Sequence, residues 1–213
     1  MKIRILILFF SIISLSIFSQ SDKRSKLKPM KIGFFYAYAS NEIFFHDDPD
    51  YTYSTNTLKG QAFYNLGNWK KLKFELIVQP QVQFIKHQLI NEQFVLPSEK
   101  NYLEKRAEFT QQKSMNIYGL EFGLVLRKNL FAKLDILATA GLGFTYINTR
   151  TERLAKGFTF IENFSLGIEH QFIKDHCIYL GTTIGHVSNL NFKQPNSGYN
   201  ILGFEIGYSF YIN

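Results

Sequence analysis

The chain has 213 residues, a formal net charge of +7 and a composition that is 46% hydrophobic, 16% aromatic and 19% charged. This length suits one domain of ordinary size, and 22 Phe and 12 Tyr residues bring too much apolar surface for a chain that stays unfolded. A single cysteine, Cys177, excludes both an internal disulfide framework and a zinc site built on cysteines. The mean hydropathy of −0.10 argues against a helical membrane protein.

Residues 1–19 predict a signal peptide. Lys2 and Arg4 give a basic start, and the apolar stretch Ile5–Phe18 is too short to span a bilayer comfortably. We expect cleavage after this segment, export of a bacterial protein, and a single domain over residues 20–213. The alternative is a tail anchored by an uncleaved helix.

Residues 134–146 show the pattern that dominates the rest of the chain, an alternation with a period of two. One set of alternate positions is apolar, whereas the other is small or polar except for Leu137. Successive residues of a strand point to opposite faces, so the pattern predicts a strand with one apolar side. The apolar set is Leu134, Ile136, Ala138, Ala140, Leu142, Phe144 and Tyr146.

Eight such segments follow one another, each long enough to cross a bilayer as a tilted strand. They are expected at 31–45, 51–66, 71–87, 113–127, 131–147, 156–172, 176–188 and 200–212. Short and long connections alternate, as in outer-membrane barrels with periplasmic turns and extracellular loops. We therefore predict an all-β fold, an eight-stranded antiparallel transmembrane β-barrel of the bacterial outer membrane, with a polar lumen plugged by side chains.

Aromatic residues near the strand ends support the barrel over its alternative, a soluble sandwich, because membrane barrels carry aromatic girdles at both interfaces. The residues expected in the girdles are Phe44, Phe45, Tyr51, Tyr53, Trp69, Tyr146, Tyr208, Phe210 and Tyr211.

His186 and Ser188 end the seventh segment and are two residues apart, so both project from one face. They share parity with the apolar Leu180 and Ile184, which places the pair on the lipid side, level with the outer leaflet. Polar groups there are costly unless they have a function. A histidine can accept the proton of a nearby serine, which would make the pair an acyl-transfer site for an amphiphilic ester. The tripeptide alone also fits an interfacial His and Ser that touch only head groups.

The wider segment 185–200, GHVSNLNFKQPNSGYN, resembles the outer-membrane lipid A 3-O-deacylase family, also labelled acyloxyacyl hydrolases. The resemblance implies an enzyme on an eight-stranded barrel that cleaves the ester-linked hydroxyacyl chain at position 3 of lipid A. It implies His186 as base and Ser188 as nucleophile, with no metal or other cofactor. Asn189 and Asn196 would help to form or shape the oxyanion hole.

The chain departs from the family pattern at position 200, where the family typically has a glutamate twelve residues after the serine and this chain has Asn200. Glu205 shares parity with small lumen-facing residues, whereas Asn200 shares parity with the lipid-facing Leu202. We therefore expect Asn200 to orient the histidine and Glu205 to face the lumen. An amide can hold a histidine but cannot stabilise an imidazolium by charge, so reduced activity, a different acyl position and loss of catalysis all remain open.

Other candidate sites are weaker. His46, Asp47, Asp48 and Asp50 could bind calcium or form a solvated turn. Of three further histidines, two lie at strand ends with no partner pattern, and the third, His170, is expected on the lipid face near the periplasmic end as an interfacial residue. Basic residues near the outer loops could hold anionic lipid A or serve only solubility. The histidines are His87, His170 and His176, and the basic residues are Lys86, Lys105, Arg106, Lys113, Arg150, Arg153, Lys156 and Lys193.

The expected partners are lipid A or lipopolysaccharide and the outer membrane, and the sequence leaves a homodimer open. Nucleic-acid binding is disfavoured, because the cations are spread along an exported chain. The rival interpretation is a structural or adhesive barrel without catalysis, and a porin is a third, disfavoured by the strand number.

Overall fold

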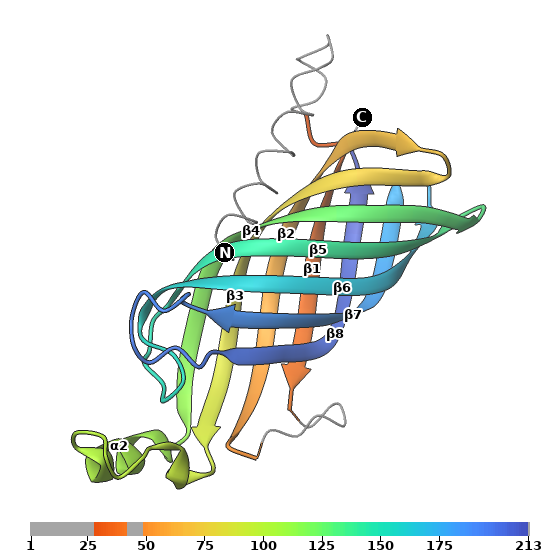
Figure 1. Cartoon of the computed structure of the whole chain (residues 1–213). Helices are drawn as coiled ribbons and strands as arrows, with labels where there is room; N and C mark the ends of the chain where they lie inside the picture. Colours follow the sequence, from red (N-terminus) through yellow and green to blue (C-terminus); the bar gives the residue numbers. More distant parts are fainter. Residues whose placement is uncertain (1–27, 42–48, 213) are drawn as a thin grey trace.

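The computed structural model describes residues 28–41 and 49–212, which form one closed antiparallel barrel in which each strand pairs with its sequence neighbours and the first pairs with the last (Figure 1). The strands are β1 (Lys31–Ser40), β2 (Tyr51–Trp69), β3 (Leu72–Leu89), β4 (Lys113–Phe131), β5 (Leu134–Ile147), β6 (Gly157–Ile173), β7 (His176–Ser188) and β8 (Tyr199–Tyr211). The predicted fold is confirmed. No helix in the described ranges is long and apolar enough to cross a membrane. The proposed signal peptide, His46, Asp47, Asp48, Phe44 and Phe45 lie outside these ranges.

The strand bounds differ from the expected ones mainly at the ends. The ladder of β4 runs to Phe131, beyond the expected 127, because its pairing with β5 continues to the tight turn. The first strand, expected to reach residue 45, ends at Ser40. The connection 90–112, expected as a plain loop, contains a 3₁₀ turn, η1 (Glu92–Phe94), and a helix, α2 (Tyr102–Phe109).

Alternation along each strand separates two faces, as the sequence predicts. Outward positions such as Ile184 and Phe204 are about half exposed, at 56% and 49%, whereas inward positions such as Val187 are buried. Tyr51 and Tyr53, expected in the outer girdle, instead point inward, because they share parity with the buried Thr55.

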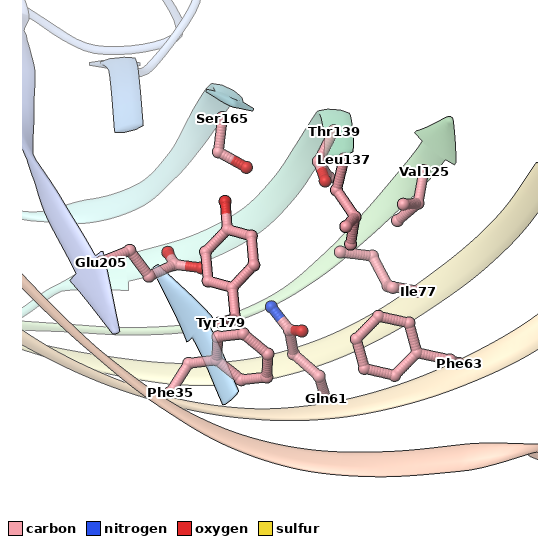
Figure 2. Close-up of a pocket in the computed structure, with 10 residues that line it drawn as sticks. All are labelled: Phe35, Gln61, Phe63, Ile77, Val125, Leu137, Thr139, Ser165, Tyr179 and Glu205. Atoms are coloured by element: carbon pink, nitrogen blue, oxygen red, sulfur yellow. The ribbon is translucent and has the colours of Figure 1, made fainter. Parts of the chain in front are cut away.

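The barrel interior is filled. A cluster of buried charges occupies part of it, with Arg127 donating to Glu75 at 3.0 Å and to Glu169 at 2.6 Å, and with Lys31 bonded to Glu169. Glu205 is buried and paired with Lys59, as expected for a lumen residue. Aromatic and aliphatic side chains from opposite walls meet beside these charges and leave a cavity of about 10 Å³ (Figure 2). This cavity is far too small for a substrate.

The two ends of the barrel differ. Tight turns join β2 to β3, β4 to β5 and β6 to β7 at one end, and the longer connections, including the one with α2, lie at the other (Figure 1). We call the latter the long-loop end. Ser188, the last residue of β7, lies at this end.

Candidate active site

His186, Ser188 and Asn200 come from the long-loop ends of two adjacent strands, β7 and β8. His186 pairs directly with Asn200 across the ladder, and the buried Val187 and Ile201 beside them point inward. His186, Ser188 and Asn200 therefore project from the outer surface of the barrel, with Asn200 exposed and the other two partly exposed. The predicted outward orientation of these three side chains is confirmed.

A hydrogen bond joins two of the three side chains. His186 Nδ1 lies 2.8 Å from Asn200 Oδ1. Because the amide oxygen only accepts, Nδ1 carries the proton in this arrangement, which leaves Nε2 as the acceptor of the neutral ring. A base must present such a lone pair, so the bond to Asn200 sets the tautomer that a general base needs.

Ser188 lies two residues after His186 on β7, but the two side chains are not hydrogen-bonded to each other. Within the described residues its hydroxyl makes no hydrogen bond, and its cross-strand neighbour on β6 is Phe160. Phe160 packs against Phe192 of the loop after β7, with ring centroids 6.2 Å apart, and Phe192 is 73% exposed. The serine therefore has an aromatic wall beside it on the outer surface. Catalytic hydrogen bonds in substrate-free enzymes are often long and shorten in the substrate complex.

Asn189 and Asn196 shape the loop that follows Ser188. The Asn189 side-chain amide donates to the carbonyl of Lys193 at 2.7 Å, and its backbone N–H donates to Asn196 Oδ1 at 2.6 Å. Asn196 in turn donates to Asn191 Oδ1 at 3.2 Å. These bonds close residues 189–196 into a compact turn directly after Ser188.

Gly198 brings the backbone against the histidine ring. Its φ of +67° is in the left-handed region, and an ideal Cβ at this position would lie 2.8 Å from His186 Nε2 and 2.5 Å from the Val187 carbonyl oxygen. Only a residue without a Cβ fits this conformation and this contact together. Close contact with the His186 ring therefore explains why position 198 is a glycine.

The connection between β5 and β6 holds this loop in place. Gly198 N–H donates to the Arg153 carbonyl at 3.1 Å, and Ala155 N–H donates to the Pro195 carbonyl at 2.9 Å. The Arg153 guanidinium forms an ion pair with Asp50 at 2.9 Å and stacks 4.3 Å from the Tyr51 ring centroid. The loop beside the serine is thus tied, through Arg153, to the start of β2.

The other sequence candidates lie elsewhere. His87 is buried, with Nε2 2.7 Å from Glu152 Oε1, a partner that sequence reasoning missed. His176 contacts the Tyr208 hydroxyl and His170 the Lys133 carbonyl, both near the tight turns. Several of the loop cations are already engaged, as in the pairs Lys105–Glu99 and Lys113–Glu108. No cluster of three potential metal ligands occurs in the described ranges, and Asp50 is an ion-pair partner of Arg153.

A cavity of about 370 Å³ lies among the loops of the long-loop end, apart from the His186–Ser188 pair. Its walls come from the segment with η1 and α2, from Arg150 and Glu152, and from Gln194, Pro195 and Ser197 of the loop after Ser188. Hydrogen bonding to Lys105 lowers the pKa of Glu99 in its wall.

The closed ring of eight antiparallel strands and the polar cluster on its outer surface define a class, an outer-membrane β-barrel with a candidate hydrolytic site. Within that class, the family model of lipid A 3-O-deacylase (PagL) matches residues 78–209, more than half of the chain. The chain therefore belongs to the lipid A 3-O-deacylase family, a family of ester hydrolases of the bacterial outer membrane. No curated protein sequence matches it significantly.

Two solved structures resemble the barrel. The crystal structure of the outer membrane enzyme PagL gives a TM-score of 0.54 at 12% sequence identity, covering 85% of this chain and 99% of that one. Neisserial surface protein A (NspA) gives a TM-score of 0.50 at 9% identity, covering 86% and 97%. At these identities the likeness concerns the fold.

Proposed function

We propose that this protein hydrolyses an ester-linked hydroxyacyl chain of lipid A by a serine-esterase mechanism at the lipid-facing surface of the barrel. His186 is the base, Ser188 the nucleophile, and Asn200 the group that orients the imidazole. The observation that carries the proposal is the 2.8 Å bond from His186 to Asn200 on the same outer face as Ser188. Family membership supports lipid A as the substrate.

The reaction proceeds as two acyl transfers. His186 Nε2 accepts the Ser188 hydroxyl proton as Oγ attacks the ester carbonyl carbon, and the bond from that carbon to the sugar oxygen breaks. The imidazolium gives its proton to the sugar oxygen, which leaves as a hydroxyl. Water then attacks the acyl-serine with His186 again as base, which releases a free fatty acid and restores Ser188.

The surroundings of the serine suit an amphiphilic ester. Phe160 and Phe192 offer an apolar wall beside Ser188 for the acyl chain. Exposed lysines near the rim can attract the phosphates of lipid A. Two of them, Lys193 and Lys156, are neighbours, with Lys193 Nζ 3.4 Å from the carbonyl oxygen of Lys156. Asn189 and Asn196 fix the turn that follows Ser188 and so help to shape the oxyanion hole. No metal or cofactor enters the proposed steps.

Export is part of the same proposal. Residues 1–19 act as a signal peptide that is removed, and residues 20–213 form the single mature domain. Mass spectrometry of the intact protein purified from outer membranes tests this, because cleavage lowers the mass by that of the segment.

The test of activity is mass spectrometry of lipid A from a Gram-negative host that has no deacylase of its own. The host expresses the wild type, Ser188→Ala, or Ser197→Ala as a control serine in the neighbouring loop. Wild type and Ser197→Ala should remove one hydroxyacyl mass, and Ser188→Ala should remove none. Insertion of each barrel is checked by its heat-modifiable migration on gels. Unchanged lipid A with all three inserted barrels would instead support the structural or adhesive alternative.

A further inference from the structure

The amide at position 200 leaves the proposed mechanism without a negative charge on the outer face of β8. Asn200 orients His186 through its carbonyl oxygen, but it is neutral. A serine nucleophile makes the histidine an imidazolium during acyl transfer, and that positive charge is stabilised by a nearby carboxylate in serine hydrolases. A carboxylate that stabilises the His186 imidazolium therefore has to come from another strand or loop.

Glu162 lies on the other side of the histidine. In the register of β6 and β7, Glu162 pairs directly with His186, just as Asn200 pairs with His186 from β8. Directly opposed residues on one face of an antiparallel pair have Cβ atoms about 4.5–5.5 Å apart. Glu162 is exposed on the outer surface, so His186 is flanked by a carboxylate on β6 and an amide on β8.

The placement of Glu162 has no other explanation in its surroundings. Within the described residues its side chain forms no hydrogen bond or ion pair, whereas Glu75, Glu121, Glu169 and Glu205 in the interior all do. On β5, the residue paired with Glu162 is Leu142. On the same face of β6, Glu162 lies between Phe160 and Phe164. On the outward faces of β6, β7 and β8 it is the one acidic residue. A carboxylate on a surface that faces lipid is costly unless it has a function.

We infer that Glu162 is a positioning residue for His186, which supplies from β6 the negative charge that the family pattern would place at position 200. The inference rests on the proposed function. The two neighbours of the histidine complement each other, because Asn200 fixes the ring and its tautomer while Glu162 stabilises the imidazolium through space. Coulomb attraction over this separation is strong beside a bilayer, where the surroundings are less polar than water.

The experiment measures kcat and KM of the purified full mature barrel in detergent micelles, with purified lipid A as substrate. Glu162→Gln should lower kcat about 10- to 100-fold with KM changed less than about 3-fold, since an interaction made mainly in the transition state is removed. Glu162→Asp, which keeps the charge, should recover part of the loss. Glu104→Gln is the control, because it removes an exposed carboxylate from α2, in the connection between β3 and β4.

Repeating Glu162→Gln in a protein that also carries Asn200→Glu separates an electrostatic role of Glu162 from a merely structural one. Asn200→Glu restores the family residue and should raise kcat, and in that background Glu162→Gln should cost less than about 3-fold, because the charge is already supplied. A structural role would give equal losses in both backgrounds and would overturn the inference, as would an unchanged kcat for Glu162→Gln. Ser188→Ala run in parallel distinguishes the two failures: if it retains activity, the proposed function itself is wrong.

Discussion

Two histidines at the long-loop end have partners of similar geometry and different surroundings. His87 lies 2.7 Å from the carboxylate of Glu152, and both side chains are buried. His186 lies 2.8 Å from the amide of Asn200 on the outer surface, with a serine two residues away. His87 has the stronger electrostatic partner, a carboxylate, but it is buried and has no nucleophile beside it. His186 has the weaker partner, an amide, but it lies on the accessible outer surface near a serine hydroxyl. Access and the neighbouring hydroxyl, more than the quality of the partner, identify the candidate site.

The largest expected effect comes from removing His186, and removal of His87 is its comparison. His186→Ala should lower deacylation by at least about 1,000-fold, because removal of a catalytic base disables the whole unit. His87→Ala should keep activity within about 5-fold, since its ring touches Glu152 and Tyr51 rather than the outer surface. Initial rates on purified lipid A measure both. A large rate loss for His87→Ala in a barrel that still inserts would erase the distinction between the two pairs.

Gly198 offers a way to disturb His186 without changing any side chain of the site. Gly198→Ala should lower kcat about 10- to 100-fold, because the new Cβ would press on Nε2 and move the ring out of line with the serine. The left-handed backbone adds a cost of about 1–2 kcal/mol.

The matched control is Gly67→Ala. Gly67 also has a positive φ, +132°, but an added Cβ would meet nothing within 4 Å. It lies at the opposite end of the barrel, so this variant should lose some stability and keep its kcat. If both alanine variants reduced kcat to the same degree, backbone strain would be the cause and the contact with His186 would be irrelevant.

Much of this arrangement follows from the period of two. Because each step along a strand reverses the side chain, parity alone places His186, Ser188 and Asn200 outside and Glu205 inside, and the structure has them so. Nearness to a strand end misplaces Tyr51 and Tyr53 on the outer surface, whereas their shared parity with the inward-pointing Thr55 places them correctly. Strand ends and α2 were missed because ladders extend past the alternating stretch and loop structure depends on packing.

To predict which residues lie opposite each other on adjacent strands, the register of the strands is needed as well as the parity. The expected strand ends at 172 and 176 already place Glu162 opposite His186, yet the family pattern directs attention to β8. The His87–Glu152 contact could not be predicted in this way. It joins residues 65 positions apart, and Glu152 lies in a connection whose path is set by the contacts of Arg153 with Asp50 and Tyr51.

The smallest effect on activity is expected from the buried pair. Glu152→Gln removes the charge opposite His87 and should weaken the packing of the 148–156 connection by about 1–3 kcal/mol, as for other buried charged hydrogen bonds. Opening would then be roughly 5- to 160-fold more frequent, which limited trypsin digestion at Arg150 and Arg153 measures. Deacylation should change less than about 3-fold, because the backbone bonds from Ala155 to Pro195 and from Gly198 to Arg153 remain.

Glu99→Gln is the comparison for that digestion. Glu99 also lines the loop cavity, but its ion pair with Lys105 is solvent-accessible, with 40% of the carboxylate side chain exposed. Such pairs contribute about 0–1 kcal/mol, so cleavage should stay close to the wild-type rate. Faster cleavage in Glu152→Gln alone would assign His87 and Glu152 to the support of the loop next to Ser188. Equal cleavage in both variants would mean that this buried pair contributes no more than an exposed one, and the loop would then depend on its backbone bonds and on Arg153.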